Sequence, residues 1–165
     1  MFIAHLPAGY LLANRMAKSH RHRKPLIAVG LFAAILPDLD LIWFYLVDDQ
    51  QTNHHAYFFH WPLFWLGLAL CAWLLAGAMQ FNKAKPFIQI ATASLLLHMA
   101  LDSIAAEIGW LRPFFSAELH LVHIPSSYDW WVWNFIWHWT FALELIITLA
   151  AAFVFWRRSR PNTPR

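Results

Sequence analysis

The 165-residue chain has little charge and almost no cysteine. Only 13% of its residues are charged, about half the share found in soluble domains, and 60% are apolar. Cys71 is the single cysteine, which excludes an intramolecular disulfide and a thiolate zinc cluster. The sequence also has no glycine-rich phosphate loop, no GxSxG motif and no HExxH motif. These absences argue against a soluble domain and against several common enzyme signatures.

Four long apolar runs predict an all-α membrane protein, a bundle of four transmembrane helices. Residues 2–18 form a shorter N-terminal apolar helix, and the sequence leaves open whether it also spans. Pro37 lies inside the first run, where its missing N–H predicts a kink. Residues 157–165 form a basic tail. The predicted spans are residues 25–47, 57–79, 86–108 and 132–156 of a single domain, residues 1–156.

The loops between these runs alternate in charge. Residues 15–24, residues 80–85 and the tail are basic, whereas residues 48–56 and 109–131 carry acidic side chains against the single Arg112. The positive-inside rule then places the basic loops and the C-terminus in the cytoplasm. This predicts a multi-pass protein of the inner (cytoplasmic) membrane. The net charge of +3 lies in these loops, so nucleic-acid binding is not expected.

Ten histidines are the compositional feature that points to chemistry. Asp38 and Asp40 lie within the first apolar run, where a charge costs about 3 kcal/mol on insertion scales. His98 and Asp102 are spaced i,i+4 and share a helix face, either as a buried hydrogen-bonded pair or as metal ligands. The orientation set by Lys and Arg places these residues in the outer leaflet with further histidines. The residues predicted to gather there are His5, Asp38, Asp40, His54, His55, His60, His98, Asp102 and His138.

Neutral imidazoles and carboxylates without a cysteine set suit a divalent metal, with zinc favoured and Mn²⁺ or Fe²⁺ as alternatives. The cluster exceeds the needs of one tetrahedral ion, so one or two ions are expected. A two-metal site would activate water at a phosphoryl or ester centre. Other polar residues have simpler explanations. His120 and His123 lie on an amphipathic helix predicted at 114–124, which suits the membrane interface, and Glu144 lies below the cluster in the last span.

The order of these motifs resembles a known family, the membrane-bound metal-dependent hydrolases, also described as YdjM-like inner-membrane proteins. His5 matches the early histidine of the family, and LPDLD at 36–40 matches its Pro-Asp-x-Asp motif. His55 and His60 keep the spacing of its His-Arg-Gly-x-Thr-His-Ser motif. The later His-x-x-x-Asp motif is matched by residues 98–102. The resemblance covers roughly residues 1–115, in the same order as in the family.

The resemblance implies metal-dependent hydrolase activity, with Asp38, His60 and Asp102 as catalytic candidates. Ala56 and Tyr57 replace the family's Arg-Gly. An arginine there would hold a phosphate or carboxylate by two hydrogen bonds, so its loss leaves the substrate class open. Arg112 is a candidate substitute. The metal-site candidates that the resemblance implies are His5, Asp38, Asp40, His55, His60, His98 and Asp102.

The leading hypothesis is a hydrolase that acts at the outer leaflet on a phosphoester or ester of an amphiphilic substrate. A tryptophan-rich rim near the start of the last span favours such a substrate over a soluble one. A bis-histidine haem protein is an alternative, with His60, His98 and His138 on separate spans. A metal or proton transporter is a third. It would need polar residues towards the cytoplasmic side, where the sequence has few. The membrane lipid is the one partner expected, and the oligomeric state is open.

Overall fold

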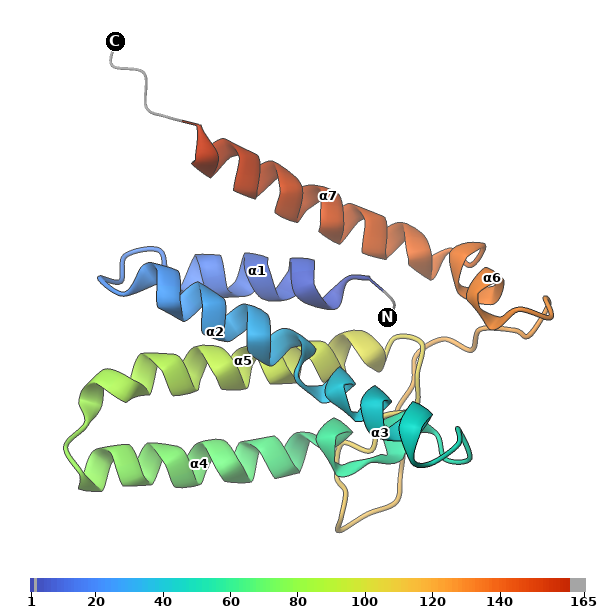
Figure 1. Cartoon of the computed structure of the whole chain (residues 1–165), viewed down its shortest axis with the longest axis horizontal. Coiled ribbons are helices and arrows are strands. Elements are labelled where there is room, and N and C mark those ends of the chain that lie inside the picture. The colour runs from blue at the N-terminus through green and yellow to red at the C-terminus, as the bar shows by residue number, and fades with distance from the viewer. Residues whose placement is uncertain (2, 161–165) are drawn as a thin grey trace.

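The computed structural model describes residue 1 and residues 3–160, and these form helices apart from loops and one isolated β-bridge. The longer helices run back and forth along one axis, and the shortest ones lie at one end of that axis (Figure 1). Residues 161–165 of the predicted tail lie outside the described part. The helices are α1 (His5–Met16), α2 (Arg23–Ile35), α3 (Asp40–Leu46), α4 (Pro62–Ala78), α5 (Lys85–Asp102), α6 (Trp131–Ile136) and α7 (Thr140–Ser159).

The all-α class is confirmed for the described residues, and the number of spans is two or three rather than clearly four. Asn82–Asp102 and Thr140–Ser159 are long and apolar enough to cross a membrane. Helix α2 and residues Pro37–Leu46 make a third when taken as one span bent by 52°. Helix α4 is apolar but has only 17 residues.

The predicted kink at Pro37 is confirmed. Proline has no N–H to donate, and α2 ends at Ile35, two residues before it. A single 3₁₀ turn, η1 (Pro37–Leu39), then leads into α3 at the 52° bend. The two carboxylates of this segment therefore lie at a break in the helix. They are not neighbours on a continuous helix, where residues two apart would diverge.

Helix ends differ from the predicted ranges where the backbone is constrained locally. Helix α4 begins at Pro62, not at residue 57, because the residue before a proline is held out of the helical conformation. The last apolar run is interrupted between α6 and α7. At that break the imidazole Nδ1 of His138 lies 2.9 Å from the hydroxyl of Thr140, the first residue of α7.

The amphipathic helix predicted at 114–124 is wrong. Leu119 exchanges two backbone hydrogen bonds with Ile108, and the N–H of Leu121 donates to the carbonyl of Ser103. These long-range bonds use the backbone groups that a helix would pair internally. The segment is therefore a loop laid along the residues that follow α5, and His120 and His123 lie on this loop.

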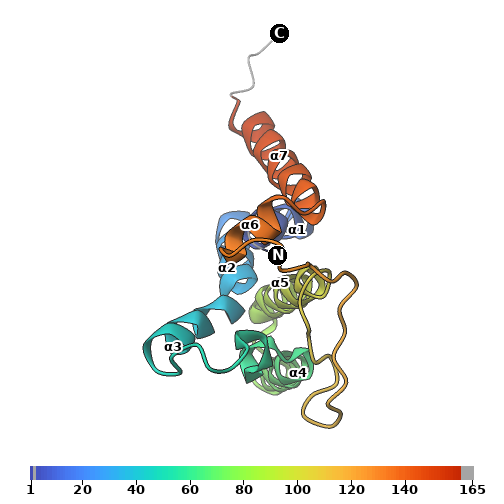
Figure 2. The ribbon, with the colours of Figure 1, turned by 90° about the vertical axis from the view of Figure 1, so that its right-hand side faces the viewer.

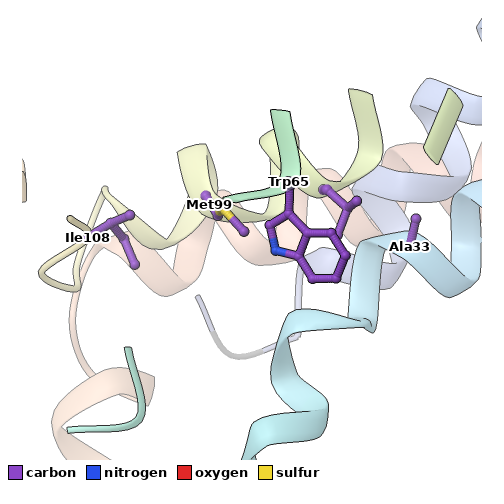
Figure 3. Packing of buried hydrophobic residues seen from close by; sticks show 5 residues of the cluster. Ala33, Trp65, Met99 and Ile108 are labelled. Atoms are coloured by element: carbon purple, nitrogen blue, oxygen red, sulfur yellow. The ribbon is translucent and has the colours of Figure 1, made fainter. Parts of the chain in front are cut away.

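Small side chains let the first helices pack closely. A Cβ on Gly9 of α1 would lie 2.3 Å from the Cβ of Ala34, and one on Gly30 of α2 would lie 2.4 Å from the Cβ of Ala13. Helix α5 contacts α1, α2 and α4, and α7 packs on α1 (Figure 2). A core cluster joins α2, α4 and α5, with the indole of Trp65 between Ala33 and Met99 (Figure 3).

The close approach of α1 and α2 predicts opposite effects for two glycine substitutions. Gly30→Ala should lower the free energy of unfolding by about 1–3 kcal/mol, because its Cβ meets Ala13 and Ile90. Gly67→Ala on α4 has open space around its Cβ and should raise stability by about 0.5–1 kcal/mol through helix propensity. Thermal unfolding in detergent measures both. Equal effects of the two substitutions would contradict this packing.

Candidate metal centre

The imidazoles and carboxylates of the predicted cluster meet at one end of the bundle, where α2 breaks, α5 ends and residues 54–60 form two 3₁₀ turns. Three of them are almost completely buried: His60, His98 and Asp102 have 0%, 1% and 1% of their surface exposed. The structure brings together all seven residues predicted as metal ligands. They are His5, Asp38, Asp40, His55, His60, His98 and Asp102.

The orientation of His98 is set by the backbone of α2. Its Nδ1–H donates to the carbonyl of Ala34 over 2.8 Å. This carbonyl belongs to the last turn of α2, where carbonyls are left without partners inside the helix. In the neutral imidazole, Nε2 therefore carries a lone pair. That nitrogen lies 3.0 Å from Oδ2 of Asp102, one helical turn further along α5.

The orientation of His60 is set by Asp40. Its Nδ1 lies 2.7 Å from Oδ2 of Asp40 and donates a hydrogen bond to it. In the neutral imidazole, Nε2 of His60 then also carries a lone pair. This atom lies 3.4 Å from Nε2 of His98 and 3.8 Å from Oδ2 of Asp102.

With both imidazoles neutral, three acceptor atoms face one another in a buried place. Nε2 of His98 lies 3.0 Å from Oδ2 of Asp102, and in the neutral imidazole it has no proton to donate to that oxygen. A buried acceptor without a partner costs free energy, and a neighbouring pair of acceptors adds repulsion. A cation is the partner that satisfies all three at once. Asp38 offers a fourth atom, with Oδ1 at 3.6 Å from Nε2 of His98 and 3.8 Å from Nε2 of His60.

His5 joins the cluster from α1. Its ring stacks on that of His98, with ring centres 3.9 Å apart, and Nε2 lies 3.0 Å from Oδ1 of Asp102. The same carboxylate oxygen lies 2.6 Å from the amino group of Met1. His5, Asp38 and His98 form a second group whose ligand atoms lie within 4.8 Å of one another.

The two 3₁₀ turns, η2 (His54–Ala56) and η3 (Phe58–His60), bring a third group, His54, His55 and His60. Asn53 caps the first turn by accepting the N–H of His55. Burial lowers the pKa of His55 from 6.5 to about 2, so its imidazole is neutral, the form that binds a metal.

His54 was predicted to gather in the outer leaflet but is not one of the seven residues predicted as metal ligands. Its Nδ1 is buried and lies 3.5 Å from Oδ1 of Asp40. The signal that could have found it is its position beside His55.

Hydrogen bonds to one carbonyl hold this segment in place. Trp61 and Arg112 both donate to the carbonyl of Ala56, at 3.0 and 3.2 Å. Arg112 also pairs with Glu118. The guanidinium is therefore used to tie the loop after α5 to residues 54–60. A cavity of about 460 Å³ lies beside the cluster, and Asp38, His54, His55 and Asp102 are the charged and histidine side chains in its lining. We call it the polar cavity. Arg112 is not among its lining residues.

Two other polar residues of the last run lie outside the three groups. His138 pairs with Thr140 at the start of α7. Glu144, buried in α7, accepts the backbone N–H groups of Ile3 and Ala4 at the start of α1, where the helix dipole favours a negative charge. This carboxylate anchors α7 to α1.

The fold and the cluster together describe an apolar, helical protein with a buried His/Asp constellation at one end of its bundle. The sequence profile described as YdjM inner membrane protein matches residues 1–162. The chain therefore belongs to the YdjM inner membrane protein family. No curated protein and no solved structure matches it.

The buried neutral His55 predicts a pH dependence of stability. Below about pH 6.5 the imidazole binds a proton in the unfolded chain but not in the folded one, so the free energy of unfolding should fall as the pH decreases, by up to about 1.4 kcal/mol per unit for this group. His55→Gln should reduce this loss. Thermal unfolding at about pH 7.5 and about pH 5.5 with a chelator measures it. His22→Gln, at an exposed position, should follow wild type, and parallel curves for all three proteins would contradict the prediction.

Proposed function

We propose that this protein is a membrane-embedded, metal-dependent hydrolase whose His/Asp cluster binds one or two divalent cations. The observation that carries the proposal is the convergence of three buried acceptors, Nε2 of His60, Nε2 of His98 and Oδ2 of Asp102, within 3.0–3.8 Å of one another. Two nitrogens and a carboxylate oxygen suit zinc, with manganese or iron as alternatives.

The ligand sets differ in how firmly their members are held. His60, His98 and Asp102 would hold the first ion, with Asp38 as a further ligand. Asp40 and the carbonyl of Ala34 orient the two imidazoles from behind, which raises their basicity and restricts their rings. A second ion would draw on the groups that contain His5, His54 and His55.

The catalytic roles follow from exposure. A bound divalent cation would lower the pKa of a water molecule and polarise a phosphoryl or ester oxygen. Asp38 is the carboxylate of the cluster that reaches the cavity most openly, with 31% of its side chain exposed. It is placed to accept a proton from the attacking water. His60 and Asp102 are buried and would position the reacting group through the cation.

The proposed topology places the cluster in the outer leaflet of the inner membrane. The chain turns between α1 and α2 and between α4 and α5 lie at the end of the bundle opposite to α3 and α6, as does the end of α7 (Figure 1). The basic segments of the sequence fall at these turns and would face the cytoplasm. In this arrangement α4 is a short fourth span, in addition to α5, α7 and the bent span. Helix α1 is the additional N-terminal helix. Residues 1–156 form a single domain.

The two other hypotheses find less support. For bis-histidine haem, Nε2 of His98 faces Oδ2 of Asp102 at 3.0 Å, a carboxylate that haem ligation does not need, and His138 pairs with Thr140. For a transporter, the interior towards the basic end is mainly an apolar cluster of Ala13, Ala17, Leu26 and Ile90, with Asn14 and Ser94 as the buried polar residues near it. The amphiphilic substrate of the hydrolase remains the better match to a polar cavity inside a membrane protein.

Metal analysis tests the proposal directly. Detergent-purified wild type, supplied with zinc or manganese, should retain about one to two equivalents per chain, and His98→Ala/Asp102→Ala should lose them because two of the three converging acceptors are removed. His120→Ala/His123→Ala is the matched control on the loop after α5 and should keep the metal.

A metal-free wild type, or equal retention by both double variants, would overturn the metal site. If the metal binds as expected, release of phosphate or acid from lipid phosphoesters and esters tests the hydrolase activity. Activity should follow the metal content across the variants.

The orienting role of Asp40 predicts a graded effect. Asp40→Asn removes the charge behind His60 and should weaken metal affinity about 10–100-fold without abolishing binding. Asp49→Asn, an exposed acidic residue of the same outer region, should leave the affinity unchanged. Competition with a chromogenic chelator measures both. Identical affinities for the two variants would remove Asp40 from the site.

A further inference from the structure

An apolar groove lies on the face of α3 that points away from the polar cavity. Its volume is about 480 Å³. One wall is the stripe of Leu39, Ile42, Trp43 and Leu46, which have the i, i+3, i+4 and i+7 spacing of one helix face. The other wall is the aromatic segment 57–59 that precedes α4. Asp40 is the one carboxylate on its lining.

This face of α3 is left open by the described part of the chain. Ile42, Leu46 and Val47 have 60%, 77% and 58% of their surface exposed. Large exposed apolar patches mark contact with a membrane or a partner. Because the chain belongs to an inner-membrane family, lipid is the expected neighbour of this exposed apolar face.

The groove and the polar cavity meet at the His/Asp cluster. Asp40 lines the groove and His54 lines the cavity, and their Oδ1 and Nδ1 atoms are 3.5 Å apart. Asp40 also bonds His60 inside the cluster. An apolar slot on one side and a cavity with histidine and carboxylate side chains in its lining on the other match the two halves of an amphiphile, with the cluster at their junction.

We propose that the groove seats one acyl chain of a membrane glycerophospholipid, whose phosphate-bearing head group occupies the cavity lined by Asp38, His54 and His55. The head-group half rests on the proposed function, because a phosphate beside Asp38 and Asp102 requires a cation to offset the like charges. The acyl-chain half rests on the groove alone. The two halves can therefore fail separately.

The test is site-resolved photolabelling in vesicles. Metal-loaded wild type is placed in phosphatidylcholine vesicles with a small fraction of phosphatidylglycerol that carries a diazirine at the end of one acyl chain. After irradiation, peptide mass spectrometry locates the adducts. Label on Trp43, Leu46 and Phe58 should exceed label on the exposed α4 residues Leu70 and Leu74 by about tenfold, the ratio that about 1.4 kcal/mol of preference produces.

Two double variants of similar added bulk sharpen the result. Leu46→Trp/Val47→Trp fills the groove and should remove the excess label from Trp43 and Phe58. Leu74→Trp/Leu75→Trp adds nearly as much bulk to an exposed face of α4 and should leave that label unchanged. The wild-type map by itself decides the question if the groove variant does not fold.

Several outcomes overturn the acyl-chain site. One is label spread evenly over α3, α4 and α7, which means surrounding lipid only. Another is excess label that persists in the groove variant. A third is chain-to-chain cross-links at α3 in place of lipid adducts, which means that a second copy covers the groove. Metal analysis of the same samples separates the two proposals: groove label without bound metal removes the proposed function, and bound metal without groove label removes the lipid site.

Discussion

The hydrogen bond from Nδ1 of His98 to the carbonyl of Ala34 is the interaction on which the site depends. It joins α5 to the last turn of α2 inside an apolar bundle, where an unpaired carbonyl would be costly. It also decides which nitrogen of His98 remains an acceptor. The break that ends α2 is imposed by Pro37, and the same break turns Asp38 and Asp40 towards His60. Pro37 therefore leaves the carbonyl of Ala34 free to accept from His98, and it also positions the two carboxylates that follow it.

Close packing of small residues makes that hydrogen bond possible. Ala34 touches Gly9 of α1, and Gly30 touches Ala13, so α1 and α2 lie against each other and against α5. In a membrane, helices gain little from hydrophobic burial against one another, and close contact of small residues is a main source of their association. The packing that holds the bundle together is thus the packing that brings His5 over the ring of His98.

The arrangement carries a conflict when both imidazoles are neutral. The two imidazoles present lone pairs to each other and to Asp102, in a place where 0–1% of each side chain is exposed. Buried polar groups in proteins are paired, and those that are not mark functional sites. A bound cation would remove this conflict, and the polar cavity beside Asp38 gives a route to it. The tryptophans exposed near α6 and the open face of α3 are the side chains that a lipid interface favours.

The sequence alone determined the helical, membrane-embedded class, because apolar runs of this length have few other solutions. It also determined the kink at Pro37 and the set of His and Asp residues, because charges inside apolar runs need partners wherever they lie. The sequence did not predict the helix ends or the structure of the loop after α5. Residues 114–124 have an amphipathic pattern, but Ile108 and Ser103 take their backbone hydrogen bonds.

Only the tertiary structure decided the partners. In the structure His60 bonds Asp40, and His98 donates to the carbonyl of Ala34. His54 lies beside Asp40. Arg112 bonds the carbonyl of Ala56 and pairs with Glu118. These choices depend on distances between residues up to 64 positions apart in the chain, which local pattern and propensity do not encode.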